Sequence, residues 1–224
     1  MNRTRIKFCG LARLDDVRAA VELGVDAIGF VLTRKSRRFV EPAAARALRD
    51  QLPPFVSAVA LFMDDDAAWI EQAIATLRPD LLQFHGAETA SFAERFDRPY
   101  LKAVPMASIA DVAAFAAGHP RAGGFLLDSH AAGASGGSGE AFDWTRVPRA
   151  FARPLVLAGG LDASNVAQAI ALARPYAVDV SSGIETAPGI KDAARMRAFV
   201  EAVHDADARA GGNPSPSPAL SSKG

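Results

Sequence analysis

The chain has one cysteine, no excess charge of either sign, and no apolar run long enough to cross a bilayer. Cys9 is the only cysteine in 224 residues, which excludes an internal disulfide. Lys+Arg and Asp+Glu each number 25, so there is no general attraction to nucleic acid or to an anionic membrane. Residues 1–5 lead into a strand-like segment rather than into a signal peptide, and no stretch approaches the ~20 apolar residues of a membrane span. We expect a cytoplasmic protein that binds neither nucleic acid nor membrane.

Segments typical of strands and of helices alternate along the chain. Short apolar runs bounded by turn residues predict eight strands. These cover residues 5–9, 26–32, 55–62, 81–84, 100–104, 123–127, 155–158 and 177–180. The expected helices include residues 88–96 and 108–117, one capped by Asp162, and a last helix carrying Met196, Phe199, Val200 and Val203. After the sixth strand, a Gly/Ser loop at 133–139 replaces the helix, with a short turn near Trp144.

Eight strand–helix units without a linker predict an α/β fold, a compact single-domain (β/α)₈ barrel. Such barrels have about 250 residues, with ~200 near the lower limit. A doubly wound open sheet is the alternative, since short strands are easily misassigned. We expect residues 1–208 to form the barrel and residues 209–224 a disordered tail, because the sequence from Gly211 onward is rich in Gly, Pro and Ser.

Glycine-rich turns follow the last two expected strands. Gly159-Gly160 comes after the seventh, and Ser181-Ser182-Gly183 comes after the eighth. Phosphate groups in barrels of this kind bind at the loops after strands seven and eight, where backbone N–H groups approach an anion. Gly137 and Ser138, after the sixth strand, are placed to close over the same group. Each of these segments could also be a simple tight turn.

Cys9 and Asp128 end the first and sixth expected strands. A lone cysteine is commonly a small buried hydrophobic residue, and an aspartate after a strand commonly caps a turn. In a closed barrel, strand eight lies beside strand one, so both phosphate-binding loops lie between Asp128 and Cys9. That order suits a general acid and a general base acting on a sugar phosphate, each worth about 10²–10⁴-fold in rate.

Other polar residues follow further strands. The basic run at residues 34–38 is either a solvated loop or the source of an arginine that grips a carboxylate in bidentate fashion. Gln83 and His85 end the fourth strand and can hydrogen-bond a polar substrate. The remaining histidines have no metal-ligand spacing, and no GxGxxG follows the first strand, so we expect no metal and no dinucleotide cofactor.

Short motifs at the ends of most strands resemble phosphoribosylanthranilate isomerase of tryptophan biosynthesis. They occur in that family's order and extend over nearly the whole chain except the tail. The motifs are KFCG at 7–10, DAIGFVLTRKSRRFV at 26–40, LLQFHG at 81–86, FLLDS at 125–129, GGSGEAFDW at 136–144, LAGGL at 157–161, VDVSSGIE at 178–185 and PGIKD at 188–192. Phe8, Phe84 and Thr33-Arg34 depart mildly from the family pattern, as does Ser129-His130 after Asp128.

The resemblance implies an Amadori rearrangement that needs no metal or organic cofactor. It implies that Asp128 is the general acid that opens the ribose ring and that Cys9 is the general base that removes the C2′ proton. Arg38 matches the arginine that contacts the anthranilate carboxylate. Asp179 and His85 match positions near the substrate. The phosphate site matches Gly159, Gly160, Ser182 and Gly183, with Gly137 and Ser138 in a covering loop.

Two alternatives remain open from the sequence. The first is another sugar-phosphate barrel enzyme: an epimerase would need metal-binding histidines at strand ends, and a synthase would need a catalytic lysine, for which Lys102 is the candidate. The second is a phosphate-ligand binding barrel without catalysis, which would have no use for the pair of Cys9 and Asp128. Balanced charge and the lack of an isolated apolar patch favour a monomer.

Overall fold

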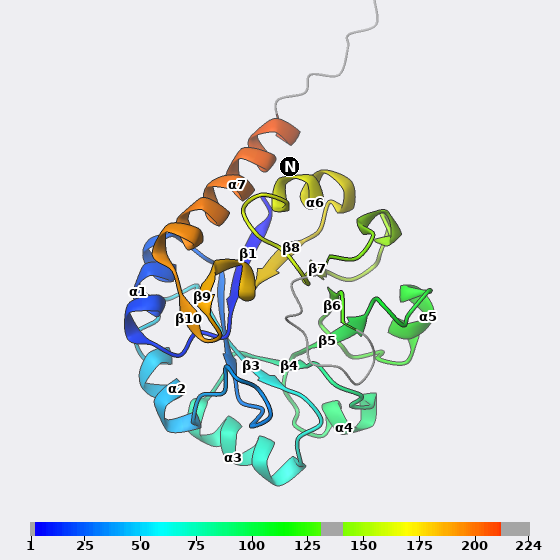
Figure 1. The fold of residues 1–224 in the computed structure, drawn as a ribbon. Helices are drawn as coiled ribbons and strands as arrows, with labels where there is room; N and C mark the ends of the chain where they lie inside the picture. Colours follow the sequence, from blue (N-terminus) through cyan, green and yellow to red (C-terminus); the bar gives the residue numbers. More distant parts are fainter. Residues whose placement is uncertain (1–2, 131–140, 212–224) are drawn as a thin grey trace, which may run out of the picture.

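A computed structural model describes residues 3–130 and 141–211 of the chain. Eight parallel strands close into a barrel, and the helices lie around it (Figure 1). The strands, in barrel order, are β1 (Arg5–Cys9), β2 (Ala27–Val31), β3 (Ser57–Phe62), β4 (Leu81–Phe84), β5 (Tyr100–Pro105), β6 (Gly124–Asp128), β7 (Leu155–Leu157) and β8 (Ala177–Val180). The predicted barrel is confirmed, and the open sheet is excluded because β1 pairs in parallel with β8.

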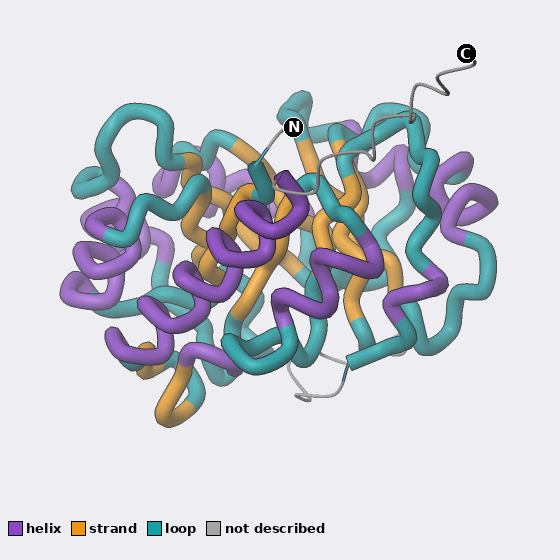
Figure 2. The backbone as a smooth tube through the Cα atoms, turned by 90° about the horizontal axis from the view of Figure 1, so that it is seen from above, coloured by secondary structure: helices purple, strands orange, loops and turns teal. Residues whose placement is uncertain are grey.

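Helices and 3₁₀ turns connect consecutive strands and cover the outside of the barrel (Figure 2). They are α1 (Leu14–Glu22), α2 (Pro42–Arg49), α3 (Ala67–Leu77), α4 (Ala90–Glu94), α5 (Val112–Ala117), η1 (Trp144–Arg146), α6 (Val166–Ala173), η2 (Ser182–Ile184) and α7 (Ala193–Gly211). Their apolar faces, such as Val17, Ile70, Val166 and Phe199, pack on the outward side chains of the strands in one continuous core. Within the described residues, no helix is long and apolar enough to span a membrane.

Three helices begin later than predicted, because turns occupy the residues before them. Thr89 caps α4 and Asp111 caps α5, each side chain accepting hydrogen bonds from backbone N–H groups of the first turn. Asp162 was predicted to cap α6, and this prediction is wrong. Its carboxylate accepts from the N–H groups of Ser164 and Asn165, which form a turn, and Asn165 occupies the N-cap position.

The sequence prediction missed a two-stranded hairpin after β8. It consists of β9 (Glu185–Ala187) and β10 (Ile190–Lys191), joined by a turn in which Gly189 has a φ of +80°. Glycine adopts that conformation without steric cost. The last helix continues to Gly211, past the domain boundary expected at 208, and the rest of the proposed tail lies outside the described residues.

The register between strands sets which residues meet inside the barrel. Lys7 of β1 lies opposite Asp179 of β8, and Cys9 lies opposite Gly29 of β2. Alternate residues of a strand point to the same side, so Lys7 and Cys9 share the inner face of β1.

Candidate active site

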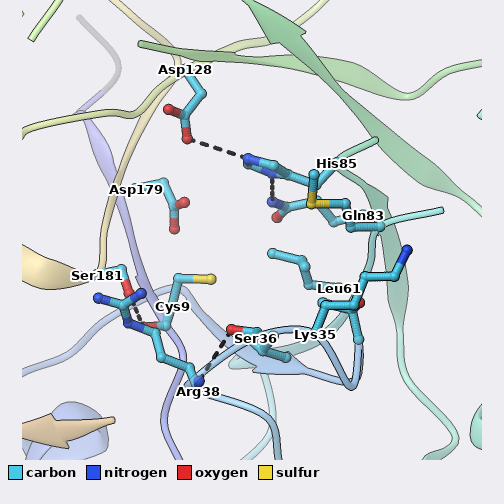
Figure 3. Close-up of a pocket in the computed structure, with 13 residues that line it drawn as sticks. Cys9, Lys35, Ser36, Arg38, Leu61, Gln83, His85, Asp128, Asp179 and Ser181 are labelled. Atoms are coloured by element: carbon cyan, nitrogen blue, oxygen red, sulfur yellow. Dashed lines mark hydrogen bonds and ion pairs between the residues drawn. The ribbon is translucent and has the colours of Figure 1, made fainter. Parts of the chain in front are cut away.

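A pocket opens at the carboxyl ends of the strands, where barrel enzymes place their active sites (Figure 3). It is lined by every residue that was predicted to be catalytic or to bind the substrate elsewhere than at its phosphate. These residues are Cys9, Arg38, Gln83, His85, Asp128 and Asp179. Ser36, which was not predicted, lines it as well, and so does Ser181, the first residue of the turn predicted to bind phosphate after the eighth strand. In Figure 3, Cys9 and Asp128 lie on different sides of the pocket, and Asp179 lies between them.

The Cys9 thiol is buried and lies beside a lysine. Only 5% of the residue is exposed. Burial raises the pKa of the thiol, while the nearby ammonium of Lys7 acts to lower it. Lys7 in turn forms an ion pair with Asp179, at 2.7 Å between Nζ and Oδ1. The isolated protein at neutral pH therefore holds Cys9 as a thiol with a cation next to it.

Two histidines flank the carboxylate of Asp128. His130 Nδ1 lies 3.3 Å from Oδ1, and His85 Nε2 lies 3.5 Å from Oδ2. The two imidazole rings stack, with centroids 4.6 Å apart. Burial favours the neutral acid, but hydrogen bonding to His130 and the electrostatic interactions with both imidazoles outweigh it, and the pKa of Asp128 is lowered. The carboxylate form therefore predominates in the free protein.

Gln83 determines how His85 presents its ring. Its amide nitrogen lies 3.1 Å from His85 Nδ1. With that nitrogen as donor, Nδ1 accepts, and the single ring proton is on Nε2, facing Asp128. Burial lowers the pKa of His85 to about 4, so the ring is neutral at physiological pH.

His85, Asp128 and His130 also form a group whose ligand atoms all lie within 4.8 Å of one another, close enough to consider a metal ion. Sequence spacing did not reveal this group, because its members come from the residue after β4, the end of β6 and the loop after β6. The two histidines face different oxygens of the carboxylate, and we interpret the group as an acid with two imidazole neighbours. The expectation that no metal is needed stays a prediction.

Arg38 is held by a chain of charges that begins in the hairpin. Its Nε and Nη2 donate to both oxygens of Glu185, the closest contact being 2.7 Å. Glu185 also pairs with Lys191, whose Nζ lies 2.8 Å from Oε1. Lys191 Nζ donates further to the carbonyl oxygens of Cys9 and Ser181, at 2.6 Å and 3.1 Å. The hairpin thus connects Arg38 to the end of the strand that carries Cys9.

The two predicted phosphate-binding loops are in contact. Gly159 and Gly160 follow β7 with φ of +80° and +65°. Gly183, in η2 after β8, packs so closely on Leu161 and Asp162 that a side chain there would collide with the Leu161 carbonyl oxygen. The loops therefore form one surface next to the pocket residue Ser181. Gly137 and Ser138 lie outside the described residues.

Lys102 is not available for the catalytic role considered for a synthase. Its Nζ donates to the carbonyl oxygen of Gly86 at 2.5 Å and pairs with Glu88 at 3.0 Å. Both side chains of this pair are 2% exposed.

The fold and the pocket define the class of protein. The closed parallel barrel has a thiol, a carboxylate and an arginine around one pocket at its carboxyl end, with paired glycine loops beside it. These features define a barrel enzyme of the kind that acts on small anionic substrates by proton transfer.

The model of the family N-(5'-phosphoribosyl)anthranilate (PRA) isomerase matches residues 6–202. The N-(5'-phosphoribosyl)anthranilate isomerase of Stenotrophomonas maltophilia R551-3 is 54% identical over 92% of this chain and 95% of its own length. That of Nitrosospira multiformis is 46% identical over 89% of this chain and 96% of its own. The chain belongs to the phosphoribosylanthranilate isomerase family, which confirms the resemblance inferred from the motifs.

Solved structures agree with this assignment. The Thermotoga maritima enzyme superimposes with a TM-score of 0.81 at 34% identity, covering 90% of this chain and 99% of its own. The Thermus thermophilus enzyme does so with 0.78 at 37%, with the same coverage. A further isomerase structure, with a TM-score of 0.75 and 32% identity over 90% of this chain and 99% of its own, holds reduced 1-(o-carboxyphenylamino)-1-deoxyribulose 5-phosphate.

Proposed function

We propose that this protein converts N-(5-phosphoribosyl)anthranilate into 1-(2-carboxyphenylamino)-1-deoxyribulose 5-phosphate in tryptophan biosynthesis. The observation that best supports this proposal is the lining of the pocket: Cys9 and Asp128, which are far apart in the sequence, line it together with Arg38. The reduced product analogue named for a related structure supports the same substrate class.

The reaction requires one acid and one base. Asp128 gives a proton to the ribose ring oxygen while the C1′–O bond breaks and the aniline nitrogen lone pair forms a C=N bond. Cys9, as thiolate, removes the C2′ proton, and the electron pair moves through C2′=C1′ to neutralise the iminium nitrogen. The enolamine then takes a proton at C1′ and releases the proton of its 2′-hydroxyl, which gives the ketone. The iminium acidifies the C2′ proton, so a modest base suffices.

In the free protein, Cys9 and Asp128 favour the protonation states opposite to those that this scheme requires. Catalysis uses the thiolate of Cys9 and the protonated form of Asp128, whereas burial favours the thiol and the histidines favour the carboxylate. The active form is therefore the minor arrangement of a single proton shared between two sites. Its fraction stays constant between the two pKa values, because a change of pH does not alter how that one proton is distributed.

Charged groups of the pocket suit the two ends of the substrate. Arg38 is oriented by Glu185 through Nε and Nη2, and we assign it to the anthranilate carboxylate. We assign the substrate phosphate to the surface formed by Gly159, Gly160, Ser182 and Gly183. Gln83, His85 and Asp179 then face the ribose between these two ends.

Purified protein should convert phosphoribosylanthranilate after treatment with EDTA and without added cofactor. Cys9→Ala and Asp128→Asn should each lower kcat by at least about 10²-fold, while a product analogue still binds. Asp205→Asn, the same change at an exposed position of α7, is the control and should retain full activity. Full activity in either pocket variant contradicts the assignment of acid and base.

Two further assays separate the alternatives. Rescue of a tryptophan auxotroph that lacks this isomerase step distinguishes it from another sugar-phosphate enzyme. A protein that binds the product analogue but turns over no phosphoribosylanthranilate would instead be the non-catalytic barrel.

We also infer a monomer in the cytoplasm. The monomer is supported by the exposed large apolar side chains of the described residues, which come from separate segments of the chain. These are Leu14, Phe55, Tyr176 and Ile190. The Thermotoga maritima relative is described as dimeric, so a dimer is the alternative. Light scattering after size exclusion at micromolar concentration tests this; a dimer overturns it, and the fully exposed Phe55 is then the residue to change.

A further inference from the structure

We propose that Lys7 is a positioning residue for the base: its ammonium, anchored by Asp179, is the buried counter-ion that makes the Cys9 thiolate accessible. The inference rests on the proposed role of Cys9 and adds a residue that the motif KFCG contains but that the mechanism has not used.

The geometry brings the two groups together over Gly29. A methyl group built on Gly29 would lie 2.9 Å from Cys9 Sγ and 3.1 Å from Lys7 Nζ. Sulfur and ammonium therefore converge on the same small space, which exists because residue 29 has no side chain. Their residues point inward from one strand, two positions apart, and β2 supplies the space beside them.

Asp179 fixes the ammonium in this place. The Nζ–Oδ1 distance is 2.7 Å, and the lysine and aspartate side chains are 5% and 9% exposed. Burial alone would discharge the lysine, but attraction to Asp179, and also to Cys9, raises the pKa of Lys7 above its ordinary value. A lysine held charged under the thiol is what a buried thiolate requires, because an unpaired buried anion is very costly.

The other cations near Cys9, Lys191 and Arg38, already form ion pairs with Glu185. Lys191 of β10 contacts the Cys9 carbonyl oxygen rather than being free to move to the sulfur, and it pairs with Glu185. Arg38 is paired with the same glutamate. Asp179 carries the opposite sign and acts to raise the pKa of Cys9. Of these groups, Lys7 exerts the largest opposing effect on the Cys9 pKa after burial.

A purely structural ion pair inside the barrel is the competing explanation, and the chain contains its own control. Lys102 and Glu88 form a second buried pair at the same end of the barrel, 3.0 Å apart. Lys7→Met with Asp179→Asn removes one pair without leaving an unpaired charge, and Lys102→Met with Glu88→Gln removes the other. Comparing the two double variants separates loss of an ion pair from loss of the counter-ion of Cys9.

The readout is the rate of Cys9 alkylation by iodoacetamide as a function of pH. Only a thiolate reacts, and since Cys9 is the single cysteine, the label reports on one residue. We expect the midpoint of alkylation in the Lys7/Asp179 variant to rise by about one pH unit, a ten-fold smaller thiolate fraction. The alkaline limb of kcat should move by the same amount. The Lys102/Glu88 variant should keep the wild-type midpoint.

Asp179 acts to raise the pKa of Cys9, so its removal offsets part of the effect, and Lys7→Gln alone is measured beside the double variant. An unchanged midpoint in both variants overturns the inference, as does an equal shift in the control. If the double variant does not fold, the midpoint of Lys7→Gln alone decides. Because alkylation needs no substrate, a shift in a protein that lacks isomerase activity would refute the proposed function and leave the role of Lys7 intact.

Discussion

Substitution of Gly29 by alanine is the sharpest test of how the base is positioned. Gly29 lies on β2, and its backbone forms the floor under Cys9 Sγ and Lys7 Nζ. The added methyl carbon would be 2.9 Å from the sulfur, 3.1 Å from the ammonium and 3.3 Å from the Cα of Cys9. Unbonded heavy atoms prefer separations of roughly 3.5–4.0 Å, so the sulfur has to retreat by about 0.6–1 Å.

That displacement determines the expected loss. A misplacement of about 1 Å at a reacting group can cost ~10²-fold in rate, which corresponds to about 2.7 kcal/mol of transition-state stabilisation. We therefore expect Gly29→Ala to lower kcat by 10–100-fold, to change KM little, and to lower Tm by a few degrees from overpacking, on the order of 1 kcal/mol or more. Steady-state kinetics and thermal unfolding of the same preparation measure all three.

Gly123→Ala is the matched control. The same methyl group on Gly123, the residue before β6, meets the Tyr100 carbonyl oxygen at 3.5 Å, an ordinary contact, and lies at the amino end of the barrel. It should leave kcat unchanged. If Gly29→Ala retains wild-type kcat while folding normally, then Cys9 and Lys7 are not fixed over Gly29 and the account of the base is wrong.

Three further outcomes follow from the site. Because the active form shares one proton between Cys9 and Asp128, kcat/KM should stay level from neutral pH up to the ordinary thiol pKa of 9.0, and an earlier alkaline decline would contradict this. His130→Phe removes the imidazole that lies 3.3 Å from Asp128 and acts to lower its pKa, so the acidic limb of kcat should move to higher pH; a fixed limb shows that His130 does not influence the acid. Glu185→Gln frees the guanidinium of Arg38 and should raise KM about ten-fold with a smaller change in kcat, whereas a loss confined to kcat would argue against carboxylate binding.

The barrel and the location of its site could be predicted from the sequence. Each buried strand is a short apolar run, and the residue types that end such runs stand out from them, as Cys9 and Asp128 do. Because parallel strands place their carboxyl ends at one rim, the position in the chain was enough to bring these side chains to one pocket.

The charged residues that support the site could not be predicted in the same way. Lys7 sits in a strand where a polar residue suggests exposure to solvent, and only its pairing with Asp179 from the far end of the chain reveals a buried cation. Glu185 and Lys191 belong to a hairpin too short to show a period of two, yet they hold Arg38. His130 approaches Asp128 by a local turn that has no spacing signature.

The hairpin also determines when the site can exist during synthesis of the chain. Lys191 Nζ bonds the carbonyl oxygen of Cys9, and β1 obtains its second neighbour from β8. β1 is the first strand to leave the ribosome, but Cys9 at its end is anchored only after β8 and the hairpin, almost the last parts of the barrel, have been synthesised. Contacts so distant in sequence form late in folding. A nascent or truncated chain thus carries Cys9 without the neighbours that orient it, and the pair of Cys9 and Asp128 faces one pocket only when the barrel is complete.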